Sequence, residues 1–286
     1  MIAILGGLGA ALAWAVATLC SARSSRLIGS AATLSWAMLI GLAVVTPLLF
    51  IGGPVSLSGA ELGWMAASGL GNVLGLLLVY RAFQFGKIGI VAPIVSTEGA
   101  IAAVVSVTAG EQLSLAAGVM LGAIVVGVAM VAAATSEDER PDDRSGIRHR
   151  PIATGYAMAA ALSFGLSLYA TGQIGATLPT AWAALPARLI GVVAVAVPLL
   201  LLSRLRLTSA AAPFVVAVGL AEVIGFMSYA YGATHGIAVA AVLASQFAAI
   251  AAVAAHFLFG ERLTARQAAG AATIVVGVAL LTALQA

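Results

Sequence analysis

The chain has 286 residues, of which 62% are apolar and 8% are charged, and its formal net charge is +3. A soluble protein of this length needs far more charge to cover its surface, so the composition excludes a soluble globular protein. The single cysteine, Cys20, excludes an internal disulfide and a cysteine-based metal site, and no motif indicates a cofactor. The small net charge gives no indication of a nucleic-acid partner.

Apolar runs of about 18–22 residues follow one another along the whole chain. A helix of about 20 apolar residues crosses a hydrocarbon core about 30 Å thick, so each run predicts one membrane span. The predicted fold class is an all-α polytopic membrane protein with ten transmembrane helices in the lipid bilayer. The predicted spans are residues 2–20, 33–51, 62–80, 88–108, 115–135, 152–173, 182–202, 213–231, 237–259 and 267–284.

One strongly hydrophilic segment, residues 136–151 (SEDERPDDRSGIRHRP), divides the chain into two halves. The halves match each other at a constant offset of 150 residues. GEQLS at 110–114 corresponds to GERLT at 260–264, and IVVGVA occurs at 124–129 and again at 274–279. A constant offset over so much of each half indicates a tandem duplication.

Lysine and arginine segregate to alternate loops, beginning with the loop that contains Arg23 and Arg26. The positive-inside rule then places these loops in the cytoplasm and both termini in the periplasm of a bacterial inner membrane. Because each half has five spans, an odd number, the second half must cross the membrane in the opposite orientation to the first. Such inverted repeats hold a binding site near the midplane and work by alternating access. The predicted organisation is a first five-helix repeat at 1–135, a cytoplasmic hinge loop at 136–151 and an inverted five-helix repeat at 152–286.

The predicted orientation can be tested with cysteine labelling in intact cells. We expect an impermeant maleimide to modify Gln285→Cys but not Ser145→Cys in a Cys20→Ala background. The physical reason is the complete segregation of loop lysine and arginine to the face that carries residue 145. Labelling at position 145 without labelling at position 285 would show that the assignment is wrong.

Ionisable side chains inside membrane spans are costly and mark candidate functional sites. Near mid-membrane the chain has Glu98, Glu222 and Arg188, and Asn72 stands at the repeat position of Glu222. Each has a structural alternative: the carboxylates could be hydrogen-bonded to neighbouring helices, and Arg188 could pair with one of them to hold the bundle. The candidate substrate-binding residues are Glu98, Glu222, Arg188, Asn72, Gln246, Ser245, Trp14, Phe164, Tyr169 and Tyr80.

Each half closes with a G-E-x-L-[ST] turn, at Gly110–Ser114 and at Gly260–Thr264. Glu111 and Glu261 of these turns are expected to brace the helix that follows, since a carboxylate is favourable at a helix N-terminus. The paired pattern resembles the drug/metabolite transporter superfamily, and within it the EamA-type branch, over essentially the whole chain. The resemblance implies a ten-helix exporter of small metabolites. The aromatic amino acid exporters of bacterial inner membranes are the first group to compare.

The function that follows is secondary export of small metabolites, amino acids first. The chain has no G-x-x-x-x-G-K-[ST] loop for an ATP-driven pump, and no H-E-x-x-H or G-x-S-x-G motif for a membrane enzyme. Two alternatives stay open: an exporter of another amphipathic metabolite or drug, and a non-transporting scaffold or sensor. The fifth helix of each repeat, glycine-patterned and least polar, is expected to pack away from the cavity.

The mid-membrane charges suggest how a zwitterionic substrate would bind. If all are ionised, Glu98, Glu222 and Arg188 sum to one negative charge, so one carboxylate should be protonated or paired with a cation in the empty site. The substrate's carboxylate would meet Arg188, its ammonium a glutamate, and its side chain an aromatic wall. Glu98, with Glu222 close behind, is the predicted proton-coupling or ammonium-binding group.

Overall fold

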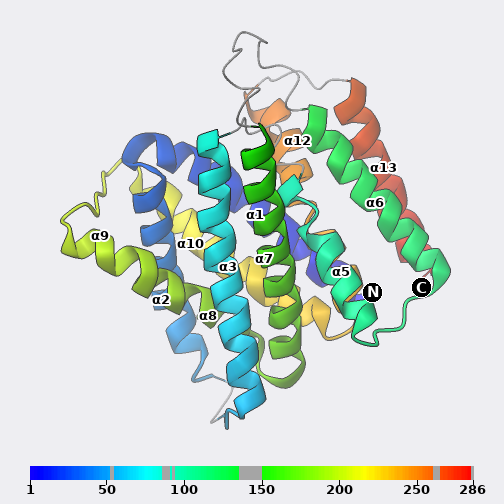
Figure 1. Cartoon of the computed structure of the whole chain (residues 1–286), viewed down its shortest axis with the longest axis horizontal. Helices are drawn as coiled ribbons and strands as arrows, with labels where there is room; N and C mark the ends of the chain where they lie inside the picture. The colour runs from blue at the N-terminus through cyan, green and yellow to red at the C-terminus, as the bar shows by residue number, and fades with distance from the viewer. Residues whose placement is uncertain (52–54, 86–90, 92–93, 135–149, 260–264, 285–286) are drawn as a thin grey trace.

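The computed structural model describes the whole chain except residues 52–54, 86–90, 92–93, 135–149, 260–264 and 285–286, and the described part consists of helices joined by turns and loops (Figure 1). The first half contains α1 (Ile2–Ile28), α2 (Ser30–Leu48), α3 (Gly59–Phe85), α5 (Glu98–Thr108) and α6 (Leu115–Ala134). The second half contains α7 (Arg150–Thr177), α8 (Thr180–Gly191), α9 (Val197–Leu201), α10 (Ala212–Ala233), α11 (Ile237–Ala244), α12 (Phe247–Phe259) and α13 (Ala265–Leu284).

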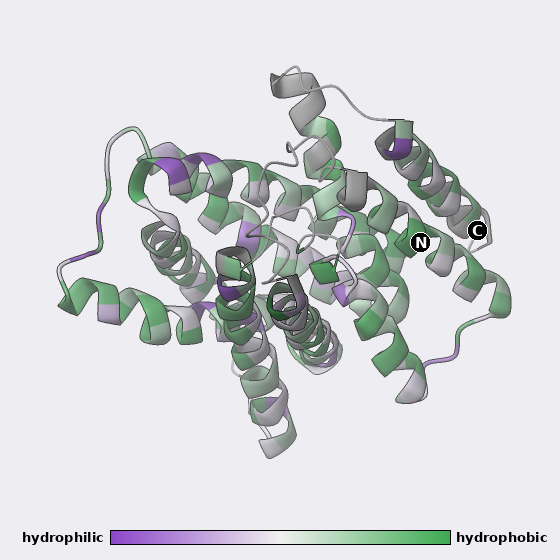
Figure 2. Cartoon of the chain, turned by 45° about the horizontal axis from the view of Figure 1, so that its top comes forward, coloured by the Kyte–Doolittle hydropathy of each residue, from purple (hydrophilic) through white to green (hydrophobic). Residues whose placement is uncertain are grey.

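The helices lie in the predicted order and are apolar on their outer faces (Figure 2). Among the described residues, six stretches are long and apolar enough to cross a membrane, namely α1, α2, α3, α7, α8 to α9, and α10. Leu5 and Val193, more than 60% exposed, are among the large apolar side chains that would face lipid. The all-α, multi-pass membrane fold predicted from the sequence is confirmed.

The ninth predicted span, residues 237–259, is not one continuous helix. α11 ends at Ala244 and α12 begins at Phe247, with a turn at Ser245 and Gln246 between them. The hydroxyl of Ser245 donates to the carbonyl of Val242 at 2.9 Å, a local bond that competes with the helical ladder. The prediction of an unbroken helix was wrong at this point.

The first half has the same interruption at the corresponding place. α5 begins at Glu98, directly after a turn at Ser96 and Thr97. The hydroxyl of Thr97 donates to the carbonyl of Ile94 at 2.6 Å. Each half therefore starts a new helix deep inside the fold, with Glu98 as its first residue in one half and Phe247 in the other.

The segment predicted as span 182–202 contains a change of helix type. A π-helical stretch, Val192–Ala196, joins α8 to α9, and Pro198 is the second residue of α9. Proline has no N–H to donate and its ring crowds the carbonyl one turn earlier, so the helix widens locally to accommodate it.

The contact between α6 and α13 shows the inverted relation of the two halves. A Cβ added at Gly127 would lie 2.9 Å from atoms of Gly270 and Ile274, and one added at Gly277 would lie 2.7 Å from Ile124. Residue numbers thus rise along α6 as they fall along α13, so the two helices are antiparallel (Figure 1). Since they are equivalent helices of the two repeats, the two halves run in opposite directions at this contact, as predicted for inverted repeats.

A second pair of contacts repeats at the offset of 150 residues. The ring of Phe164 on α7 packs against Gly75 on α3, and the ring of Trp14 on α1 packs against Gly225 on α10. A Cβ at either glycine would collide with the facing ring. The duplication seen in the sequence therefore persists as duplicated tertiary contacts, each made possible by a glycine.

Candidate functional site

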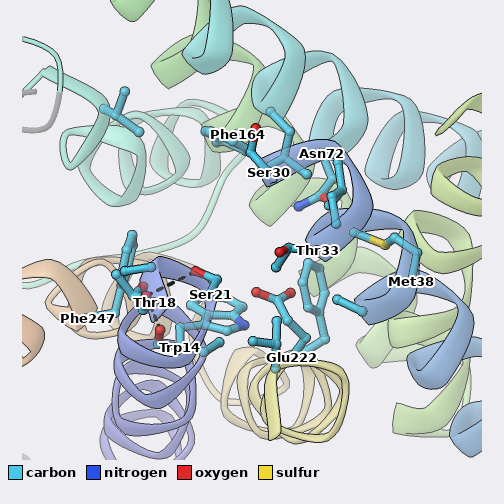
Figure 3. A pocket seen from close by; sticks show the side chains of 18 of the residues that line it. Trp14, Thr18, Ser21, Ser30, Thr33, Met38, Asn72, Phe164, Glu222 and Phe247 are labelled. Atoms are coloured by element: carbon cyan, nitrogen blue, oxygen red, sulfur yellow. Dashed lines mark hydrogen bonds between the residues drawn. The ribbon is translucent and has the colours of Figure 1, made fainter. Parts of the chain in front are cut away.

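A cavity of about 500 Å³ lies between the two halves (Figure 3). Its lining comes from α1, α2, α3 and α5 of the first half and from α7, α10 and α12 of the second. α6 and α13 pack on each other and contribute none of the described lining residues, as expected for the fifth helix of each repeat. The interrupted helices bring their new N-termini to this space, because Glu98 and Phe247 both line it.

Two carboxylates face the cavity. Glu98 is only 6% exposed, and within the described part of the chain its carboxylate accepts no hydrogen bond and faces no cation. Glu222 on α10 accepts a hydrogen bond from Nη2 of Arg188 at 3.0 Å and forms an ion pair with it. Both carboxylates belong to the lining of the same cavity. Glu98 is therefore the buried acid that still needs a proton or an external cation.

Arg188 does not line this cavity, which corrects its predicted role as the group that meets a substrate carboxylate. Its side chain is fully buried on α8, behind Glu222 and Phe226. The guanidinium carbon lies 4.4 Å from the centre of the Phe226 ring, and the ring itself is on the cavity wall. The geometry corresponds to the structural alternative, in which Arg188 pairs with a glutamate and holds the bundle together.

The position in the first repeat that corresponds to Arg188 holds a different residue, and this difference makes the two sides of the cavity unequal. Arg188 packs on Gly41 of α2, and Met38 of α2 packs on Gly191 of α8, again at an offset of 150 residues. One half thus has the pair Arg188 and Glu222, while the other half has Met38 and Asn72 at the equivalent positions. Met38 and Asn72 both line the cavity, so only one side of it carries a buried ion pair.

Aromatic rings form one wall of the cavity. Trp14, Phe226 and Phe247 pack edge to face, with ring centroids of Trp14 and Phe226 5.3 Å apart and of Trp14 and Phe247 6.3 Å apart. Phe164 also lines the cavity, as predicted for its position. Tyr169 does not, because its ring packs edge to face on Trp64 at 5.8 Å.

The remaining predicted residues differ in where they lie. Asn72 lines the cavity, whereas Ser245 and Gln246 are buried at the turn between α11 and α12 and do not. A Cβ at Gly99 of α5 would lie 2.6 Å from Oγ of Ser245, so this turn packs against α5. The side chain of Tyr80 lies outside the described part of the chain.

Sequence reasoning missed a group of hydroxyl residues on α1 and α2. Thr18, Ser21 and Ser25 of α1 and Ser30 and Thr33 of α2 all line the cavity (Figure 3). The three residues of α1 are spaced by three and four positions, which places them on one face of a helix. This spacing in the sequence indicates a polar helix face. The sequence prediction did not include it, because it was based on polar groups near mid-membrane.

The cavity opens toward the turn between α1 and α2 and is closed at its other end. Ser25 and Ser30, on either side of that turn, belong to its lining, and Ser30 is exposed. At the closed end the backbones of Gly6 on α1 and Gly232 on α10 touch, leaving no room for a Cβ on either. Close glycine contact of this kind lets membrane helices seal against each other.

Glu111 ties the closed end together across the two halves. Its carboxylate accepts hydrogen bonds from the backbone N–H of Ile237 at 3.1 Å and of Ala238 at 3.2 Å, at the start of α11, and from the hydroxyl of Ser106. The expectation that Glu111 braces the helix that follows it was therefore wrong, because it caps a helix of the other half. Glu261 lies outside the described residues.

Removing this cap should loosen the closed end of the cavity. Loss of a carboxylate N-cap costs about 1 kcal/mol, which would raise the open population about fivefold. We therefore expect Glu111→Ala to speed maleimide labelling of Ala233→Cys, a buried position on α10, in the Cys20→Ala background. Glu61→Ala is the matched control, since Glu61 accepts a hydrogen bond from the N–H of Ser58 at the start of α3 and lies outside the cavity. Equal labelling rates in both variants would contradict the capping role.

Comparison with known proteins agrees with this architecture. One solved structure, titled only as the crystal structure of a protein, is similar with a TM-score of 0.80 at 17% sequence identity, over 99% of this chain and 98% of its own. That likeness concerns the fold alone, and comparison with curated proteins found no match. Residues 1–133 and 152–283 each match the sequence model of the EamA-like transporter family. Since both halves match, the chain belongs to the EamA-like transporter family, whose members move small molecules across membranes and are not enzymes.

Proposed function

We propose that this transporter exports small amino-bearing metabolites, amino acids first, across a bacterial inner membrane by alternating access. Family membership provides the general activity, secondary transport of a small molecule. The observation that carries the choice of substrate is the cavity between the halves, where the buried Glu98, which has no partner among the described residues, lies beside an aromatic wall. An ammonium group would neutralise the carboxylate, and the rings would accept the rest of the substrate.

The direction of transport follows from the orientation proposed from loop charges. The cavity opens toward the turn between α1 and α2, and Arg23 and Arg26 near that turn favour the cytoplasm. The arrangement is thus an inward-facing one, in which an exporter loads its substrate. Closing this end and opening the end held by Glu111 would complete the cycle.

Glu98 also provides a route for coupling export to protons. A buried carboxylate is costly as a bare anion, and Glu98 has no partner in the part of the chain that the structure describes, so it holds a proton when the site is empty. The substrate ammonium replaces that proton on binding, and the proton leaves to the cytoplasm through the open end of the cavity. After the cavity has opened to the other side, a proton from the periplasm binds Glu98 and replaces the substrate. Export is then linked to proton entry through one residue.

The test is counterflow of labelled amino acids into liposomes that contain the purified protein, with and without an imposed pH gradient. We expect exchange of at least one amino acid, accelerated when the gradient drives protons opposite to the substrate. Glu61→Gln, outside the cavity, should transport at the wild-type rate. If no member of a panel spanning aromatic, aliphatic and charged amino acids exchanges above protein-free liposomes, the amino acid proposal falls.

A further inference from the structure

We infer that the cavity recognises the amine of its substrate and makes no ionic contact with a carboxylate, so that monocationic amines and amino acid amides are substrates in their own right. This inference rests on the proposed export of amino-bearing compounds and narrows it to a chemical class. Three features support it: the charge of the described lining, the position of Arg188 behind it, and the direction of two hydroxyl groups on α1.

The charge of the lining favours a cation over a zwitterion. Among the described lining residues, Glu98 and Glu222 are the only charged ones. When Arg188, which is ion-paired behind them, is included, the site carries one net negative charge if Glu98, Glu222 and Arg188 are all ionised. A monocationic amine brings this sum to zero, whereas a zwitterionic amino acid leaves it unchanged and adds a carboxylate to an acidic cavity.

Arg188 is not available to compensate a substrate carboxylate. It is fully buried, its Nη2 is bonded to Glu222, and the Phe226 ring covers the guanidinium at 4.4 Å. Turning it toward the cavity would break the ion pair and leave the Glu222 carboxylate unpaired. The arginine that the sequence predicted for carboxylate binding is therefore already ion-paired through Nη2. Its Nε and Nη1 have no hydrogen-bond partner in the described part of the chain, but the residue does not line the cavity.

Among the hydroxyl groups that line the cavity, those of Thr18 and Ser21 on α1 present acceptors to it. The hydroxyl of Thr18 donates to the carbonyl of Trp14 at 2.7 Å, and the hydroxyl of Ser21 donates to the carbonyl of Thr18 at 3.0 Å (Figure 3). A hydroxyl has one proton, so both oxygens keep only lone pairs for a ligand. An ammonium can donate to these oxygens and to Glu98 together, whereas a carboxylate would find no donor in them.

The test compares three compounds that share one benzyl side chain: phenylalanine, phenylalaninamide and N-acetylphenylalanine. The first is a zwitterion, the second a cation and the third an anion, so they separate the two charged groups. Binding to the purified protein is measured by isothermal titration, which avoids passive permeation of the amide through liposomes. We expect the amide to bind about tenfold or more tightly than the amino acid, and the N-acetyl compound to show no binding.

Variants assign the effect to the cavity. Glu98→Gln should weaken the amide about tenfold or more, while Glu61→Gln should leave its affinity unchanged. Binding of phenylalanine, or its counterflow, without binding of the amide would overturn the inference and leave the proposed export of amino acids standing. Equal binding of N-acetylphenylalanine and phenylalanine would also overturn it. Failure of all three compounds, together with failure of the amino acid counterflow panel, would remove both proposals.

Discussion

Glu98→Gln is expected to abolish pH-driven transport while the protein stays folded. Gln keeps the size of the side chain but has no charge to pair with an ammonium and no acidic proton to exchange. A charge-assisted hydrogen bond contributes about 1.5–3 kcal/mol, so substrate affinity should fall about 10- to 100-fold. Since Glu98 has no partner among the described residues, the substitution should leave thermal stability equal to or above that of the wild type.

The measurement is substrate flux in liposomes at several pH values, with thermal unfolding in detergent as the check on folding. Glu61→Gln provides the control for a glutamate lost at the end of a helix and outside the cavity. The variant Glu222→Gln is compared with Glu98→Gln, because it removes a carboxylate that is already ion-paired with Arg188. Wild-type flux across neutral pH from both cavity variants, each folded and at wild-type level, would end the assignment of proton coupling to these residues.

Arg188→Met is expected to destabilise the fold. The substitution leaves Glu222 without its cation, and breaking a buried ion pair by removing one partner costs about 3–5 kcal/mol. We expect the low end of that range, about 3 kcal/mol, because the Glu222 side chain is 29% exposed to the cavity and keeps some solvation. For a protein of this size the corresponding fall in Tm is about 5–10 °C.

The first repeat suggests how to restore that stability. Met38 and Asn72 occupy the positions equivalent to Arg188 and Glu222, so the double variant Arg188→Met with Glu222→Asn places the first half's pair in the second half. We expect it to recover most of the lost Tm, because no charge is left unpaired. Glu222→Asn alone should be worse than the double variant, since it leaves a fully buried arginine without its acceptor. A double variant no more stable than Arg188→Met would contradict this account.

The sequence by itself determined the membrane class, the order of the helices and the duplication. Membrane crossing depends on the length of an apolar run, a local property that can be read without knowing its neighbours. The offset of 150 residues was visible in IVVGVA and in the G-E-x-L-[ST] turns. It holds in space because the same glycines, such as Gly75 and Gly225, admit the same close contacts. Depth along the spans also identified Glu98 and Glu222, which both reached the cavity.

Only the tertiary structure decided which way each side chain faces. Successive residues turn by about 100° around a helix, and a span that is apolar on every side carries no periodic signal of its inner face. Arg188 and Tyr169 therefore had the right depth and yet do not line the cavity, because Arg188 lies behind Glu222 and Tyr169 packs on Trp64. The Glu111 cap joins residues 126 positions apart, a pairing that exists only once the two inverted halves pack together.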